Sequence, residues 1–239
     1  MFDNQKPALF TNRALARIRQ ENWHGVLADA QSALDLKAPP PITLKSYTYL
    51  GQSHLALKNP EDALRFSLKA YELAVEQNSP SVAAIAQTVM QAKKEKWEVR
   101  ERERIMEEQS TLRDVFAVVE RDAKNQRMQG VDWEVVEERE RKLKGELEEV
   151  FARADAERCR RREVPEWLVD QISFGIMLDP VLTKNGHSYD RSTLFDHLKR
   201  SQTDPLTREP LVKEDLRPNL ALRQASEDFL EENGWAVDW

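Results

Sequence analysis

The segment from Ile172 to Trp239 has the pattern of a small folded domain, yet it contains no cysteine. A segment this short rarely holds a stable core without disulfides, a metal ion or docking onto something else. The chain's single cysteine, Cys159, lies outside it, and a zinc site cannot be completed by His187 and His197 without thiolate partners. We therefore expect neither a metal nor a cofactor, and expect hydrogen bonds and ion pairs to hold the loops. The aspartates expected to carry these bonds are Asp179, Asp190 and Asp204.

Turn and capping signals divide this segment into a hairpin and two helices. Asn185-Gly186 favours a β-hairpin, because both residue types accept a positive φ. Asp190 and Asn219 can cap the helices that follow them, and Gly234 can end the second helix. The pattern predicts the order loop, hairpin, helix, loop, helix.

Composition excludes several functional classes. The 239 residues carry a net charge of −6, whereas a general nucleic-acid-binding protein is expected to show a basic stripe. No stretch approaches the roughly 20 apolar residues of a membrane span, and the first residues contain no apolar run long enough to suggest a signal peptide. One cysteine fits a reducing compartment, so we expect a cytoplasmic or nuclear protein.

The first part of the chain repeats a pattern of small side chains with a shift of 37 positions. The repeated pairs are Ala14 and Gly51, Val26 and Ala63, and Ala33 and Ala70. Helix-pair repeats of about 34 residues place small side chains where the two helices cross, and the prolines at 39–41 can hold the extra residues. The pattern resembles tetratricopeptide (TPR) repeats, with Val26 as a departure from the usual alanine. An unrelated pair of helical hairpins is the alternative.

Two repeats are one fewer than such an array normally needs to bury a continuous core. An upstream repeat would begin before Met1. Either the chain is truncated, or it is a natural short form that buries the exposed face in another way.

A long, highly charged helical region follows from Ser81. Two apolar stripes with helical spacing occur in it, separated by Gln129-Gly130-Val131-Asp132, which offers a glycine C-cap and an aspartate N-cap. The first stripe is Leu112, Val115, Phe116 and Val119; the second is Leu143, Leu147, Val150 and Ala154, preceded by Trp133 and Val136. We expect an antiparallel hairpin that pairs with a second copy of the chain. A single long solvated helix is the alternative.

These three segments, in this order, resemble the CHIP family of chaperone-associated U-box ubiquitin ligases. The resemblance is closest at residues 11–15, at residues 93–97 and from Ile172 onward, and the chain lacks the first TPR repeat. It implies a mostly α-helical fold with TPR repeats at 1–78, a dimerising helical hairpin at 79–163, and a small α+β U-box, a zinc-free relative of the RING domain, at 164–239.

The resemblance also implies a site. In this family the U-box docks a ubiquitin-conjugating enzyme, and Ile172 and Phe174 match the first docking loop and Pro205 the second. Arg208 matches the arginine that bridges the conjugating enzyme and its ubiquitin. We expect residues 172–174 to be extended, so that both large side chains lie on one side. The alternatives are core packing for Ile172 and Phe174, and an ordinary surface position for Arg208.

The resemblance further implies a groove for the acidic C-terminal tails of heat-shock chaperones. Asn12 and Lys45 match the clamp that holds the tail carboxylates, while the clamp residues of the preceding repeat are absent and Tyr49 replaces an arginine found in some clamps. The alternatives are a capping or interhelical hydrogen bond for Asn12 and a solvated charge for Lys45. We expect weak or no tail binding by this chain.

The function implied is RING-type E3 ubiquitin transfer to lysines of chaperone-bound clients in protein quality control, without a covalent enzyme intermediate. A role for Cys159 as a thioester-forming nucleophile is not expected, since it lies in a charged helix. The alternative function is a non-enzymatic co-chaperone or assembly scaffold. The presence of Ile172, Phe174, Pro205 and Arg208 together favours the enzyme.

Overall fold

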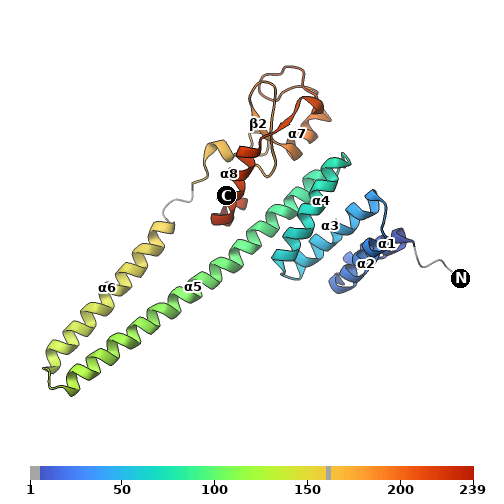
Figure 1. Ribbon diagram of the computed structural model, residues 1–239. Helices are drawn as coiled ribbons and strands as arrows, with labels where there is room; N and C mark the ends of the chain where they lie inside the picture. Colours follow the sequence, from blue (N-terminus) through green and yellow to red (C-terminus); the bar gives the residue numbers. More distant parts are fainter. Residues whose placement is uncertain (1–5, 160–162) are drawn as a thin grey trace. The chain divides into compact units, whose positions relative to one another are not determined.

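The computed structural model describes residues 6–159 and 163–239 and consists mostly of helices (Figure 1). It divides into two compact units. The first contains Met1–Glu98 and Val164–Trp239, and the second contains Val99–Glu163. In the described part of the chain, no helix is both long enough and apolar enough to cross a membrane.

Four helices form the N-terminal repeats. They are α1 (Pro7–Ile18), α2 (Trp23–Asp35), α3 (Pro40–Ala56) and α4 (Pro60–Glu76). Three of the four begin with proline at the first turn, where its missing N–H would have had no helical partner and its φ suits a helix. The helix without proline, α2, is capped instead by Asn22, whose Oδ1 accepts the amide of Gly25 at 3.1 Å.

The small side chains of the repeat pattern lie in the core of these helices. Ala14, Ala33, Ala63 and Ala70 are fully buried, and Gly51 is buried against α4 so closely that an added Cβ would overlap Oγ of Ser67. Val26, the departure from the pattern, is also fully buried. The predicted helical repeats are confirmed.

The next helix, α5 (Val82–Met128), begins by completing the repeat core. Val82, Ile85 and Val89 are buried in one cluster with Tyr71 and Ala74 of α4. The C-terminal end of the repeat array is therefore covered by the first turns of a helix that the sequence pattern had placed in the charged hairpin.

The second unit is a helical hairpin made by the rest of α5 and by α6 (Trp133–Cys159). Gly130 has a φ of +86°, and Oδ1 of Asp132 accepts the amide of Glu134 at 3.0 Å, as expected for the C-cap and N-cap of the two helices. An ion pair of 3.2 Å joins Arg127 to Glu140 across the hairpin. A single continuous helix is therefore excluded. The side chains of Ala154, in the second stripe, and of Cys159 lie outside the described part of the structure.

The C-terminal domain combines short helices with a small sheet. Its elements are η1 (Glu166–Leu168), β1 (Pro180–Leu182), β2 (Ser188–Asp190), α7 (Arg191–Leu198), η2 (Lys213–Asp215), β3 (Arg217–Pro218), α8 (Leu220–Glu232) and η3 (Gly234–Asp238). The expected caps are confirmed: Asp190 accepts the amide of Ser192, and Asn219 accepts that of Leu222. The mostly α-helical fold with a small α+β domain at its C-terminal end is confirmed.

The sheet has three antiparallel strands in the order β2-β1-β3. Val181 lies opposite Tyr189 on one side and Pro218 on the other. The expected hairpin turn is present, but only Gly186 has a positive φ, and Asn185 does not. The third strand was not predicted, because two residues ending in proline carry no alternating pattern. Pro218 can occupy it because an edge strand leaves one side unpaired.

Two apolar clusters form the core of this domain. One contains Val181, Tyr189, Leu194, Leu198 and Leu211, and the other contains Leu168, Ile176, Leu230 and Ala236. Leu178, just before β1, belongs to neither and is buried instead in the cluster of the helical repeats. The C-terminal domain and the repeats are therefore packed into one unit.

Candidate functional site in the C-terminal domain

The loops of the C-terminal domain are held by buried aspartates. Among residues 6–159 and 163–239, no group of three or more histidine, cysteine, aspartate or glutamate side chains is arranged to hold a metal ion. The domain instead buries four carboxylates, of which three were expected. They are Asp170, Asp179, Asp190 and Asp204.

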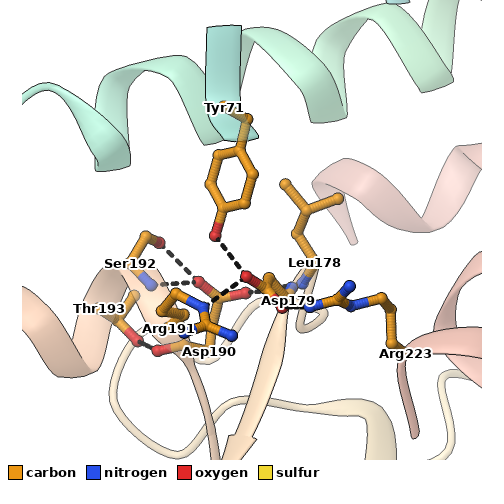
Figure 2. Close-up of polar contacts among 8 residues, drawn as sticks. All are labelled: Tyr71, Leu178, Asp179, Asp190, Arg191, Ser192, Thr193 and Arg223. Atoms are coloured by element: carbon orange, nitrogen blue, oxygen red, sulfur yellow. Dashed lines mark hydrogen bonds and ion pairs between the residues drawn. The ribbon is translucent and has the colours of Figure 1, made fainter. Parts of the chain in front are cut away.

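Asp190 and Asp179 form the centre of this network (Figure 2). Asp190 Oδ2 accepts the amides of Leu178 at 2.7 Å and Asp179 at 2.9 Å, while Oδ1 accepts the amide and hydroxyl of Ser192. Burial raises the pKa of Asp190 although these hydrogen bonds favour the charged form. The carboxylate therefore joins the loop before β1 to the start of α7.

Asp179 joins three elements. Its Oδ2 accepts Nε of Arg191 at 2.6 Å, and its Oδ1 is paired with Arg223 of α8. The hydroxyl of Tyr71, on α4, also donates to Oδ2, at 3.2 Å (Figure 2). Two guanidinium groups compensate the cost of burying this charge, which an isolated carboxylate could not bear.

The first exposed loop, residues 170–175, is organised by Asp170, which was not predicted. Its Oδ2 accepts the amide of Ser173 at 2.9 Å and the hydroxyl of Thr193, on α7, at 2.8 Å. Its backbone carbonyl accepts the amide of Phe174 at 2.8 Å. An aspartate three residues before a serine is a turn signal that could have been recognised in the sequence.

This loop is a turn, so the expected extended conformation of residues 172–174 is wrong. Phe174 has a φ of 60° and its side chain is 76% exposed. Ile172 is half-buried and packs against the core that contains Val181. The two side chains therefore do not lie on one side, and core packing describes Ile172 but not Phe174.

The second exposed loop, residues 204–209, is organised by Asp204. Its Oδ1 accepts the amides of Leu206 at 2.9 Å and Thr207 at 3.1 Å and the hydroxyl of Tyr189 at 3.1 Å. Burial alone would raise the pKa of Asp204, but these hydrogen bonds outweigh it and the pKa lies below its usual range. Burial, together with the bond to Asp204, raises the pKa of Tyr189 to about 12.

Pro205 is half-buried at the start of this loop, and Arg208 is exposed near its end. The guanidinium of Arg208 forms no hydrogen bond or ion pair with any other residue that the structure describes. Leu206, between them, is 56% exposed and was not singled out from the sequence. The loop therefore offers an unpaired cation beside an apolar side chain.

Comparison with known proteins identifies this domain. Residues 164–235 match the U-box domain. The chain is 31% identical to the E3 ubiquitin-protein ligase CHIP of Arabidopsis thaliana over 235 residues, which are 96% of this chain and 83% of that protein. The chain belongs to the CHIP family of U-box ubiquitin-protein ligases. It is therefore a RING-type ubiquitin transferase.

Other relatives match a shorter part of the chain. The ubiquitin conjugation factor E4 of Schizosaccharomyces pombe is 43% identical over 70 residues, 29% of this chain and 7% of that protein. The E4 ubiquitin-protein ligase UFD2 of Saccharomyces cerevisiae is 44% identical over 63 residues, 26% of this chain and 7% of that protein. The similarity to CHIP, in contrast, includes the helical repeats and the hairpin.

The predicted chaperone-tail residues of this CHIP-family chain lie on neighbouring helices. Asn12 on α1 and Lys45 on α3 are both exposed, and Tyr49, one turn after Lys45, is half-buried. The side chain of Asn12 forms no hydrogen bond with another described residue, so the capping or interhelical alternative is not observed.

The arginine next to Asn12 has a structural role. Arg13 makes a bidentate pair with Asp29 of α2, with Nη2 at 2.6 Å from Oδ1, and Arg17 adds a second guanidinium at 2.8 Å. Asp29 is buried, and its negative charge raises the pKa of Arg13 through the hydrogen bond. In the U-box, His197 is also structural, since its Nε2 lies 2.9 Å from the carbonyl oxygen of Thr203.

Proposed function

We propose that this ligase docks a ubiquitin-charged conjugating enzyme on the two exposed U-box loops and promotes ubiquitin transfer to lysines of chaperone-bound clients. The observation that carries the proposal is the exposure of Phe174 on one loop and of Leu206 and Arg208 on the other. Large exposed apolar side chains beside a cation form the kind of surface that binds a protein partner. Ile172 and Pro205 are half-buried in the same two loops, and we propose that they contribute to the same docking surface.

Arg208 is proposed to bridge the conjugating enzyme and its ubiquitin. An arginine presents five N–H donors in a rigid fork, so it can bond carbonyl groups on two proteins at once. In the unbound chain this fork is exposed and has no ion-pair partner among the described residues. The ligase then contributes by holding the ubiquitin thioester in a geometry ready for attack by a substrate lysine, with no covalent intermediate of its own.

The helical hairpin is proposed to pair with a second copy of the chain, giving a homodimer. Several large apolar side chains remain exposed after the hairpin has folded. They include Val118, Met128, Trp133 and Val150. Burying such side chains between two copies stabilises a dimer, at about 25 cal/mol for each Å² removed from water. The proposed division of labour is repeats at 1–78, dimerisation at 79–163 and U-box at 164–239.

Chaperone recognition is the least complete part of the proposed function. Asn12 and Lys45 are exposed, and we propose that they bond tail carboxylates, but they supply only two clamp positions. We therefore expect calorimetric titration with an acidic chaperone-tail peptide to give weak or no binding. Low-micromolar affinity that Lys45→Ala abolishes would contradict this expectation. The low cysteine content and the CHIP resemblance favour a cytoplasmic or nuclear location.

Reconstituted auto-ubiquitination with a panel of conjugating enzymes tests the docking proposal. Phe174→Ala and Arg208→Ala are expected to lose most activity, whereas Leu220→Ala and Arg217→Ala are expected to keep it. These controls match the pair in kind, since Leu220 is 66% exposed and Arg217 is exposed, and both lie outside the two loops. An inactive wild type, or unchanged rates in both loop variants, would favour a non-enzymatic scaffold.

A further inference from the structure

The two exposed loops of the U-box have the same hydrogen-bond pattern. In the first, the amide of Asp170 donates to the carbonyl of Gly175 at 2.8 Å, and the amide of Phe174 donates back to the carbonyl of Asp170 at 2.8 Å. In the second loop, the amide of Asp204 donates to the carbonyl of Glu209 at 2.8 Å, and the amide of Arg208 donates back to the carbonyl of Asp204 at 2.9 Å.

The side chains of the two loops are equivalent as well. Each aspartate carboxylate accepts the amide of the residue three positions later, Ser173 at 2.9 Å or Thr207 at 3.1 Å. Asp and Asn side chains commonly close turns in this way. The two loops are therefore the same Asp-x-x-Ser/Thr turn, with Phe174 and Arg208 at the same position.

That shared position has an unusual backbone conformation. Phe174 has a φ of 60° and Arg208 a φ of 63°, in the left-handed region that side chains with a Cβ seldom adopt. The other non-glycine residues with positive φ among those described all follow the C-terminal ends of α1 to α4, where this conformation commonly ends a helix. They are Glu21, Lys37, Lys58 and Asn78.

No helix end explains the conformation of Phe174 and Arg208. A residue with a Cβ is strained in this region and keeps this conformation only where its surroundings impose it. Here the surroundings are the hydrogen bonds of the turn, since the amide of each residue is bound to the carbonyl of the preceding aspartate. Because of this backbone conformation, Phe174 is 76% exposed although it lies two residues after the half-buried Ile172.

The same strand connects both turns to the core. Tyr189 on β2 donates its hydroxyl to Asp204 at 3.1 Å, and the amide of the next residue, Asp190, donates to Asp170 at 3.1 Å. Thr193 adds a bond of 2.8 Å to Asp170 from α7. Two consecutive residues of one strand therefore set the positions of both turns.

We infer that Asp170 and Asp204 are positioning residues for ubiquitin transfer, each holding the turn that presents Phe174 or Arg208. This inference rests on the proposed function of the two loops. Both aspartates are buried, so each acts through the residue four positions after it rather than by contact with the conjugating enzyme. Because Phe174 is an apolar anchor and Arg208 a bridge to ubiquitin, the two aspartates affect different kinetic quantities.

The test is a single-turnover assay in which the full-length ligase is titrated against a ubiquitin-charged conjugating enzyme that discharges onto free lysine. It yields a half-saturating ligase concentration and a plateau rate. Asp170→Ala is expected to raise the half-saturating concentration by about tenfold at a nearly unchanged plateau, as loss of a binding anchor does. Asp204→Ala is expected to lower the plateau by about tenfold, with half-saturation within about twofold of wild type.

Conservative variants separate positioning from a general loss of structure. Asp170→Asn and Asp204→Asn retain an oxygen that can accept the turn amide, so each is expected to restore much of the quantity that its alanine variant loses. The matched control is Asp228→Ala, an exposed aspartate of α8. If thermal melting shows that an alanine variant is unfolded, the kinetics of the asparagine variant are compared instead with those of Ser173→Ala or Thr207→Ala in the same loop.

Two outcomes would overturn the inference. One is that Asp170→Ala and Asp204→Ala both lose affinity and plateau rate in proportion to the fraction of folded protein. That result would indicate a purely structural role. The other is wild-type kinetics in folded Asp170→Ala and Asp204→Ala while Phe174→Ala and Arg208→Ala are impaired. If the latter two variants behave as wild type, it is the proposed docking function that fails.

Discussion

Tyr71 on α4 donates a hydrogen bond of 3.2 Å to Asp179, which lies 108 positions later in the chain and just before β1. The tyrosine is buried, and burial, together with the charges of Asp179 and Asp190, raises its pKa, so the hydroxyl remains the donor at physiological pH. Its partner also holds Arg191 and Arg223 of the U-box. This single bond therefore connects the helical repeats to the centre of the U-box network.

Tyr71→Phe is expected to lower the free energy of unfolding by about 1–2 kcal/mol, because it removes a buried hydrogen bond to a charged group and keeps the ring. Denaturant unfolding measures the loss, and hydrogen exchange is expected to increase around Leu178. The matched control is Tyr47→Phe, which removes a hydroxyl from a ring packed against the same cluster as Leu178. An equal loss in both variants would show that the bond to Asp179 contributes nothing specific.

Gly234→Ala is expected to destabilise the first unit by about 1–3 kcal/mol, the usual cost of forcing extra volume into a packed site. An added Cβ would overlap Cβ of Trp97 on α5, whose Nε1 donates to the carbonyl of Glu232 at 2.9 Å. Thermal melting of the full chain measures the change.

Gly145→Ala is the control for Gly234→Ala, and it is expected to raise the stability instead of lowering it. An added Cβ at Gly145, within α6, meets no described atom within 4 Å. Alanine is favoured over glycine inside a helix by about 0.5–1 kcal/mol, so this variant is expected to stabilise the hairpin. If Gly234→Ala melts at or above the wild-type temperature, the close packing against Trp97 is not required.

Lowering the pH is expected to destabilise the second loop by protonating Asp204. Its pKa lies below the unfolded value of about 3.9, so its contribution is present above that value and is lost as the pH falls through the lower folded pKa. Asp204→Asn is therefore expected to melt below wild type at pH 7, with a difference that shrinks below about pH 4. The exposed Asp228→Asn is the control, and a pH-independent difference for Asp204→Asn would contradict the assignment.

Dimerisation is expected to depend on one face of α6. Light scattering of the wild type at micromolar concentration is expected to give the mass of two chains, and Val150→Asp is expected to reduce it, because a carboxylate on the apolar stripe resists burial. Val135→Asp, similarly exposed but outside the stripe, is expected to remain dimeric. A monomeric wild type would exclude the proposed homodimer.

Local signals predicted the elements well where the chain's own neighbours decide the conformation. Asp190 and Asn219 cap the helices that follow them, as their residue types indicated. Small side chains at a fixed spacing indicated the helix pairs, since close crossing tolerates little else. The U-box was recognisable without metal ligands because its turns and caps are encoded locally.

The candidate site was predicted in composition but not in shape. Phe174 and Arg208 were identified by resemblance, whereas their left-handed backbone and the role of Asp170 were not. A residue with a Cβ has no local preference for that conformation, and only the bonds of a completed turn impose it. The short strand β3 was missed for a related reason, since its pairing with β1 defines it.

The sequence by itself determined the helical repeats, the hairpin turn at Gly130 and the zinc-free character of the U-box, because spacing, capping and residue chemistry act over a few positions. Only the tertiary structure decided that the start of α5 completes the repeat core and that Tyr71 meets Asp179. It also decided that Phe174 and Arg208 are presented by two equivalent turns. These features depend on contacts between residues far apart in the chain, whose free energy appears only when the elements pack together.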